Sequence, residues 1–480
     1  MNNKSTFSRR DMICGLAAGV ILAPSFGTAF GNQAAHGTGL DVTSFGAVGD
    51  GSHDDLGAFK QALSQLQSQG GGTLTGPSKT YFFNIASDND SLSIPSNTTL
   101  NFPKGTIFSW NYVGSPLIVL VNTTNCTIQG ITFQWSGLLK DIPGGSTQQP
   151  RYGWGGALPN RDFCANVLAL GAENLTIRDC KGEKTNQTSD LGGNCYYEFA
   201  SFHAKKDGSL SKGNRIENCE INDAVIAMMM TGQQGLVISN ITSKRFPGDH
   251  PVGGAPGLPG HILYTAITSL GYPYVSNLDV SNIFDEGQVT GKLTTAARLD
   301  STIQLKHTEK SNFRNVRSNR PTGILTMGSV IDSTFDQFLY APKEMISHAV
   351  GFMDTQSKGN YVERCKFTNF TIDIPRGVEK SAFVAANPGR IKNCYIQAKI
   401  SAGYDNASMS VIAVRSEASQ FDISFNPLTA NTIHPVMFLD GSFDSHAKVA
   451  LPARVNRAKL PTNGVRATTP RSDIQFSQQN

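Results

Sequence analysis

The stretch from Val42 to Phe83, VTSFGAVGDGSHDDLGAFKQALSQLQSQGGGTLTGPSKTYFF, decides the fold that we expect for this chain. Ser44 to Val48 is typical of a short strand, and the glycine-rich turn after it breaks the run because glycine accepts positive φ. Apolar residues then recur every three or four positions and predict a helix over Asp55 to Gln69. Asp54 and Asp55 are expected to cap that helix. Gly70 to Gly72 end it, and Thr73 to Phe83 returns to strand with a turn at Gly76-Pro77.

The same stretch resembles the opening motif of the pectate-lyase-like superfamily, in its rhamnogalacturonase and epimerase type. The matching elements are FGAVGDG, the pair Asp54-Asp55, the amphipathic helix and the three glycines, in that order. The resemblance implies an all-β fold, a single-stranded right-handed parallel β-helix with an N-terminal capping helix. It also implies action on a polysaccharide.

Composition favours a turn-rich all-β chain. Of 480 residues 48 are glycine, and only 16% are charged, while long helical patterns are scarce after Leu66. The formal net charge of +4 and the lack of a basic patch interleaved with aromatic residues give no reason to expect a nucleic-acid partner.

Residues 1–35 are expected to be an export signal and not part of the fold. Ser8-Arg9-Arg10-Asp11-Met12-Ile13 resembles a twin-arginine signal, which implies the Tat translocase as a partner during export. The apolar run from Met12 to Ala23 is shorter than the about 20 residues that span a bilayer, so no stable membrane insertion is expected after cleavage. The protein is then expected in the bacterial periplasm or outside the cell.

A weak repeat of alternating apolar residues followed by asparagine fills residues 36–445. Ile128, Ile177, Ile216, Val237 and Val275 are expected to point into one core shared by successive coils. An asparagine at each corner is expected to bond the asparagine one coil away. Residues 446–480 are basic with little periodicity and are predicted to be a disordered tail.

Seven cysteines remain after signal cleavage, and none forms a C-x-x-C pair, so metal-site spacing is absent. Several follow Asn, Asp or Arg in the repeat, including Cys180, Cys219, Cys365 and Cys394, which favours small side chains stacked in successive coils. Cys164 and Cys195 are left as a candidate loop disulfide.

Three places resemble a degraded polygalacturonase-type series: Asn222-Asp223, Gly260-His261 and Gln304-Leu-Lys306. The resemblance implies Asp223 as general acid, His261 as a positioning or proton-relay group and Lys306 as a substrate clamp. Ala224, Ile262 and Gln304 depart from the family pattern.

An inverting glycosidase needs a second carboxylate about 6.5–9.5 Å from the first. Asp249, Asp285, Glu286 and Asp300 are the candidates for it, supplied by loops or neighbouring coils. His250 beside Asp249 is a candidate base. Asp223 and Lys306 are alternatively corner or solvent-facing residues of ordinary coils.

A polysaccharide lyase needs a base and a cation instead. Lys306, His261, His307 and Arg298 are the candidates for these roles. No cofactor is required, although a lyase of this kind can use Ca²⁺, for which Asp249, Asp285 and Glu286 are the candidate ligands. On the long insertions, Trp154 and Tyr197 either stack on sugar rings or pack over the side of the coils.

The sequence therefore predicts an exported glycoside hydrolase or polysaccharide lyase whose partner is a polysaccharide. The alternative is a non-catalytic polysaccharide-binding or exopolysaccharide assembly protein on the same scaffold, which the missing carboxylates favour. A surface adhesin is a third possibility, for which no outer-membrane anchor is visible.

Overall fold

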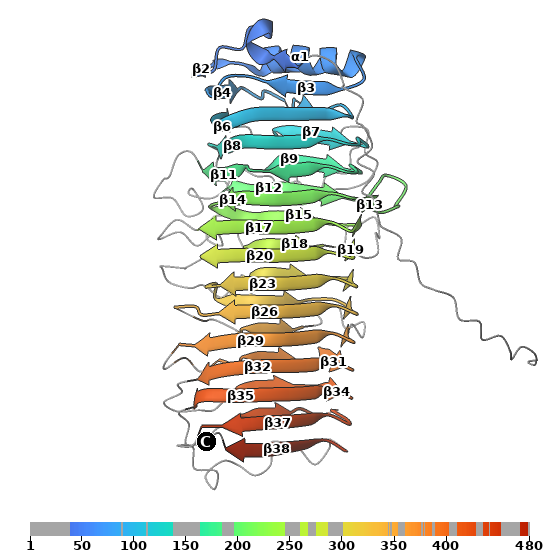
Figure 1. The fold of residues 1–480 in the computed structure, drawn as a ribbon, viewed down its shortest axis with the longest axis vertical. Coiled ribbons are helices and arrows are strands. Elements are labelled where there is room, and N and C mark those ends of the chain that lie inside the picture. The colour runs from blue at the N-terminus through green and yellow to red at the C-terminus, as the bar shows by residue number, and fades with distance from the viewer. Residues whose placement is uncertain are drawn as a thin grey trace, which may run out of the picture. The chain divides into compact units, whose positions relative to one another are not determined.

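The computed structural model describes residues 39–87, 90–111, 114–137, 164–184, 196–244, 260–266, 275–286, 301–343, 345, 348–353, 361–375, 378, 380–385, 389–402, 410–428, 435–440, 442–452 and 471–478. The predicted export signal, residues 1–35, lies outside them. Strands wind into three parallel sheets stacked coil upon coil, from the helix α1 at one end to β38 at the other (Figure 1). This is the predicted right-handed parallel β-helix.

Each sheet takes one strand from most coils. The large sheet contains β1 (Leu40–Asp41), β2 (Asp50–Asp54), β3 (Gly72–Thr75), β4 (Thr80–Phe83), β6 (Thr98–Trp110), β8 (Thr127–Trp135), β10 (Thr176–Arg178), β11 (Lys181–Lys184), β14 (Arg215–Ile221), β17 (Val237–Lys244), β20 (Asp279–Glu286), β23 (Asn312–Ser318), β26 (Thr334–Tyr340), β29 (Lys366–Ile374), β32 (Tyr395–Ala402), β35 (Gln420–Leu428), β37 (His446–Leu451) and β38 (Asp473–Gln478). The second sheet contains β5 (Leu92–Ser93), β7 (Ile118–Val121), β9 (Ala165–Leu170), β12 (Tyr196–His203), β15 (Ala224–Met230), β18 (His261–Thr265), β21 (Ser301–Leu305), β24 (Thr322–Thr326), β27 (Val350–Phe352), β30 (Phe383–Ala385), β33 (Ile412–Val414) and β36 (Val436–Phe438). The short sheet contains β13 (Ser211–Lys212), β16 (Gln233–Gln234), β19 (Val275–Ser276), β22 (Thr308–Glu309), β25 (Val330–Ile331), β28 (Tyr361–Glu363), β31 (Arg390–Lys392) and β34 (Ser416–Glu417).

The N-terminal cap is confirmed, with one change in how it is held. Helix α1 spans Leu56–Ser68 and packs Phe59 against Tyr81, Phe83 and Phe108 at ring distances of 5.0 to 5.3 Å. Asp55 makes no side-chain cap bond to the helix. Its buried carboxylate instead accepts hydrogen bonds from the backbone N–H of Val48, at 2.7 Å, and of Gly49. Asp55 therefore ties the glycine turn to the helix.

One local prediction in this region is wrong, because the strand expected over Ser44 to Val48 is not formed. Val42–Phe45 is a 3₁₀ helix, not a strand, because Asp41 caps it by accepting from Thr43 N–H. The strand follows the turn, at β2. The carboxylate of Asp50 accepts backbone bonds from His53 and Ser52, which lower its pKa to about 2.

The shared core is confirmed in register, although two of its members differ. Ile128, Ile177 and Ile216 lie side by side in β8, β10 and β14. The row continues through Ile238 and Val280, while Val237 lies one residue outside it and Val275 belongs to the short sheet. Alternation along a strand makes a one-residue difference a change of face.

The predicted asparagine ladders are present in two places. Asn125 donates to Asn97 and Asn174 donates to Asn125, at 3.0 and 3.1 Å. A second ladder crosses the large sheet through Asp179, Asn218, Asn240, Asn282 and Asn315. These residues have φ between 50° and 60°, a conformation that asparagine and aspartate tolerate better than most residues.

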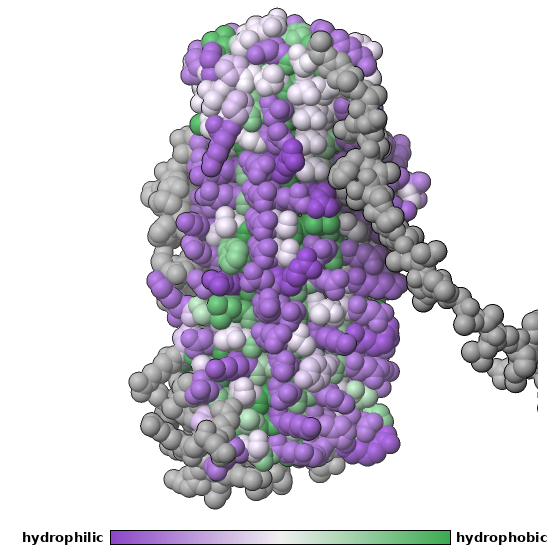
Figure 2. Space-filling view, in the orientation of Figure 1, coloured by the Kyte–Doolittle hydropathy of each residue, from purple (hydrophilic) through white to green (hydrophobic). Residues whose placement is uncertain are grey.

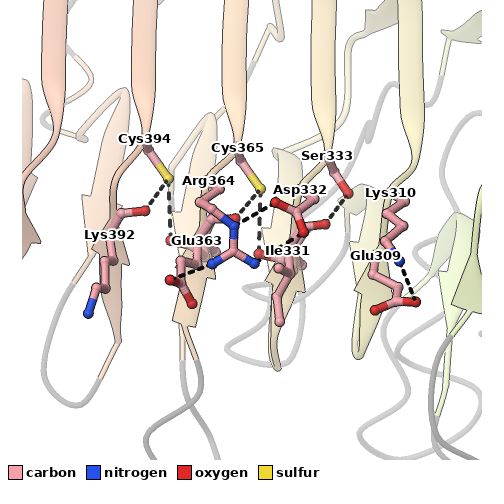
Figure 3. A network of polar contacts seen from close by, with 12 residues as sticks. Glu309, Lys310, Ile331, Asp332, Ser333, Glu363, Arg364, Cys365, Lys392 and Cys394 are labelled. Carbon is pink, nitrogen blue, oxygen red and sulfur yellow. Dashed lines mark hydrogen bonds and ion pairs between the residues drawn. The ribbon is translucent and has the colours of Figure 1, made fainter. Parts of the chain in front are cut away.

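The cysteines stack as expected. Cys365 and Cys394 lie on neighbouring coils beside Arg364, whose guanidinium bonds Asp332 and Glu363 (Figure 3). Cys180 and Cys219 form a similar pair, and burial raises the pKa of the Cys180 thiol to about 12. Burial disfavours the thiolate of Cys180 and Cys219, so these two side chains are expected to fill space and not to react. Cys195, the candidate partner of Cys164, lies outside the described residues.

The predicted end of the β-helix at residue 445 needs correction. β37 pairs with β35, and β38 pairs with β37, so the large sheet continues beyond it. Ala447, Val449 and Leu451 point inward and extend the core, with lysine and histidine on the outer positions between them. The cationic residues in this segment led to the prediction of a disordered tail, although the segment alternates like an ordinary strand.

Acid should weaken the fold through His348, just before β27. Burial first, and the charge of Lys380 second, lower its pKa from 6.5 to about 4. The unfolded chain then binds the proton more readily, so stability is intact above pH 6.5 and falls as the pH drops toward 4. The loss is expected to be on the order of 3 kcal/mol. Urea unfolding of His348→Gln across this pH range should show a shallower acid slope, whereas His53→Gln, an exposed control, should keep the wild-type slope; equal slopes in all three proteins would contradict the assignment.

Candidate functional site

The outer face of the second sheet gathers polar side chains in the middle coils. Asn166 in β9 accepts a hydrogen bond from buried Trp110, at 3.1 Å, and Thr302 in β21 donates to buried Asp285, at 2.8 Å, so both point into the coil. Ile262 in β18 lies beside Thr302 in the register. Tyr264 lies in a register row that leads to Val384, the half-exposed residue between buried Phe383 and Ala385, so this row faces outward. His261 stacks on Tyr264 and shares that face.

His261, Tyr264 and Lys306 form one cluster on this face. The rings of His261 and Tyr264 stack at 5.3 Å with an angle of 28°. The Lys306 ammonium donates to the Tyr264 hydroxyl oxygen at 2.9 Å and lies 5.2 Å from the centre of its ring. His261 and Lys306, two of the three residues that the motif resemblance implied, thus both contact Tyr264. The resemblance did not include this tyrosine.

Hydrogen bonds orient His261. Its Nδ1 lies 3.0 Å from the hydroxyl of Ser301 and 3.3 Å from the carbonyl oxygen of the same residue. A carbonyl only accepts, so this pair of partners favours the tautomer with the proton on Nδ1. The lone pair of the imidazole is then on Nε2, where it can act as a base.

The sequence reasoning also missed Glu198, a buried carboxylate. Glu198 is 0% exposed and lies opposite Ile226, which lies opposite His261 on the next strand. It therefore occupies the same outward row as His261, two strands away. Its one signal in the sequence is an acid inside the otherwise apolar and aromatic strand YYEFASFH.

Further polar side chains extend the face on either side of the cluster. Gln304 lies beside Tyr264 in the register and is 3% exposed. His203 contacts Ser201 at 3.1 Å and Thr231 at 3.3 Å. His307, at the turn after β21, has a pKa lowered by burial and by the adjacent Lys306 charge.

Asp223 lies at a corner. Its φ is 57°, it is mostly buried, and its backbone N–H donates to the carbonyl of Lys244 at 3.0 Å. Ile226, three residues further on, is the one that lies beside His261. This geometry fits the corner alternative for Asp223, and the second aspartate of the motif is replaced by buried Ala224.

Asp285 lies inside the coil and does not share the outer face. Its carboxylate pairs with the Arg320 guanidinium, both side chains being 0% exposed. Its row in the large sheet continues through Ser318, Tyr340 and Ile372, which are buried as well. Asp285 is thus not placed to supply a second carboxylate to Asp223.

The positions of the remaining candidate side chains are not described. Asp249, His250, Arg298 and Trp154 lie outside the described residues. Tyr197 belongs to β12, but only its backbone is described.

The two candidate Ca²⁺ ligands that the structure describes, Asp285 and Glu286, do not point toward a common ion. Asp285 faces the interior, whereas Glu286, the next residue along β20, is exposed and lies 3.8 Å from Lys244. Neighbouring residues of a strand face opposite sides, so these two carboxylates do not converge on one ion. Across the described ranges, no group of three or more His, Cys, Asp or Glu side chains is arranged to hold a metal ion. None of the described helices has the length and apolar character needed to cross a membrane.

Comparison with known proteins gives one curated relative. The chain is 24% identical over 336 residues, 68% of its length, to plasmin and fibronectin-binding protein A of Streptococcus pneumoniae. It spans only 39% of that protein. No family model matches the chain.

Solved structures share the architecture loosely. The Streptococcus pneumoniae surface adhesin PfbA aligns at 15% identity and TM-score 0.40, covering 92% of this chain and 91% of the other. An exopolygalacturonase from Thermotoga maritima aligns at 12% identity and TM-score 0.35, each chain being covered to 92%. Alignments this loose say nothing about activity.

Proposed function

We propose that this chain cleaves a uronate-containing polysaccharide by β-elimination on the outer face of the second sheet, as an exported bacterial enzyme. The observation that carries the proposal is the contact of Lys306 with Tyr264, which stacks on His261. A base, a proton donor and a cation in one place are the parts that elimination requires.

Each group has a separate role. Nε2 of His261 removes the proton from the carbon next to the uronate carboxylate, and those electrons form the C=C bond as the glycosidic C–O bond breaks. The Tyr264 hydroxyl gives its proton to the leaving oxygen. The Lys306 ammonium stabilises the charge that develops on the carboxylate. His261 and Tyr264 are 2% and 7% exposed, so substrate entry requires this face to open.

Hydrolysis is less well supported, because it needs two facing carboxylates. Asp285 is enclosed with Arg320, and Asp223 lies at a corner. Glu198 is the carboxylate in the His261 row, and it is the residue on which a hydrolase would depend.

A non-catalytic binding protein is the second candidate. It is favoured by the similarity to a relative whose name records binding of plasmin and fibronectin, not a reaction. On this alternative the polar face would hold a ligand without cleaving it.

The test is incubation with polygalacturonate, polymannuronate and a neutral β-glucan. Reducing ends and the ultraviolet absorbance of unsaturated uronate are followed together. Elimination raises both signals with a uronate polymer. Reducing ends without absorbance would replace the proposal with hydrolysis, and retention of a polymer without either signal would favour the binding protein.

A further inference from the structure

We propose that the outer face of the large sheet binds a second ligand, an extended uncharged polysaccharide chain that lies along the axis of the coils over the asparagine ladder from Asp179 to Asn315. This site is separate from the cluster on the second sheet. Figure 2 views this face and shows a hydrophilic strip that runs down it.

The ladder presents hydrogen-bonding groups at regular intervals. Asn240 donates to Asn218, Asn282 to Asn240 and Asn315 to Asn282, at 2.9, 2.8 and 2.7 Å, and Asn218 donates to Asp179 at 3.3 Å. An asparagine amide has two N–H donors and two acceptor lone pairs. The ladder uses one of the donors, and no second contact of these amide nitrogens is found in the described part of the chain.

The spacing suits a polymer. Neighbouring coils are about 4.8 Å apart, so one N–H donor is offered to the outside at each such step. An extended β-1,4-linked glucan advances by a similar length with each sugar. Successive sugar hydroxyls can therefore meet successive amides without a loss of register over a few coils.

A row of mixed apolar and polar side chains lies beside the ladder. Thr242, Phe284, Arg317, Leu339 and Thr371 are in register on successive strands. The Arg317 guanidinium lies over the Phe284 ring at 5.4 Å, and Leu339 is 37% exposed, unusual for a large apolar residue of this protein. Sugar rings offer apolar faces and hydroxyl edges, which match this row and the amides next to it.

The ladder runs into a hollow of about 450 Å³ at its N-terminal end. Asp179 and Asn218 belong to both features. The register of β6 against β8 shifts between Asn101 and Thr106, and Gly130 there has a φ of 79° and no room for a Cβ, which would meet the Phe102 carbonyl oxygen at 1.9 Å. Gln129 and Thr132 supply polar lining to the hollow, which can hold the end of a chain.

Charge pairing favours an uncharged ligand. Arg314 lies 3.3 Å from Asp279, Lys181 lies 2.7 Å from Glu183, and Lys244 lies 3.8 Å from Glu286. Because these three cations have acidic neighbours, most of the positive charge beside the ladder is offset, and Arg317 is the cation of the adjacent row that lies over a ring instead.

The test is an isothermal titration calorimetry experiment in which the full chain is titrated with cellohexaose, a linear neutral β-1,4-glucan. Asn240→Gly combined with Asn282→Gly removes two amides, while glycine keeps the positive φ that both positions need. We expect this variant to bind cellohexaose at least tenfold more weakly than the wild type.

Asn125→Gly, in the ladder at the other corner, is the matched control and should bind as the wild type does. Both variants should retain cleavage of uronate polymers, and Lys306→Gln should retain cellohexaose binding, which separates this inference from the proposed function. Absence of cellohexaose binding, equal binding by the double variant, or preference for hexagalacturonate would overturn the assignment.

Discussion

Replacing Lys306 by glutamine is expected to lower kcat/KM for elimination by about 10²- to 10³-fold. Glutamine keeps most of the side-chain length but removes the charge. The charge that develops on the uronate carboxylate in the transition state would then face a dipole in place of the ammonium now bonded to Tyr264. The loss should appear mainly in kcat, because the interaction strengthens as the reaction proceeds.

Lys310→Gln is the matched control. Lys310 lies four residues away with 60% of its side chain exposed, and its ammonium lies 4.0 Å from the Glu309 carboxylate. Its replacement should leave cleavage unchanged. Tyr264→Phe should lower kcat as Lys306→Gln does, since it removes the proposed proton donor. If Lys306→Gln cleaved uronate polymers at the wild-type rate, the assignment of this cluster as the reaction centre would be abandoned.

Replacing Arg320 by methionine is expected to destabilise the middle coils by about 3–5 kcal/mol. The change leaves the Asp285 carboxylate, which is 0% exposed, without the guanidinium that now neutralises it. Thr302 still donates one hydrogen bond to Asp285, but that bond does not compensate a buried charge. Urea unfolding and hydrogen exchange in β20 to β24 measure the effect.

The exposed pair between Arg364 and Asp332 provides the control. These side chains are 49% and 37% exposed, so Arg364→Met should cost about 0–1 kcal/mol (Figure 3). Arg320→Met combined with Asp285→Leu should recover most of the lost stability, because no charge is then left in the core. If Arg320→Met and Arg364→Met lowered the free energy of unfolding by similar amounts, the buried pair would stabilise the fold no more than the exposed one, contrary to this prediction.

The parts of the fold that depend on neighbouring residues were predictable. Alternation placed Ile128, Ile177 and Ile216 inward, and asparagines recurring at the corners predicted the ladders. The helix was predicted to within one residue of α1 at each end. The prediction of a disordered tail from residue 446 is wrong for β37, where Ala447, Val449 and Leu451 alternate inward as core residues do in other strands.

The site was predictable only in part. His261 and Lys306 were found through motif spacing, yet Glu198 and Tyr264 belong to no motif and were missed. The sequence offers Asp285 as a candidate second carboxylate, but its side chain points into the coil and pairs with Arg320. The face on which a side chain lies depends on the register between coils, which the sequence does not give.

By itself, then, the sequence determined that this chain winds into stacked coils with a helical cap, because turns, caps and period-two alternation are set by adjacent residues. Only the tertiary structure decided that Glu198, His261, Tyr264 and Lys306 share one face, and that Asp285 and Arg320 lie inside. Those pairings join strands separated by loops of unequal length. The register between coils, which fixes which side chains meet, is settled by packing across the whole stack.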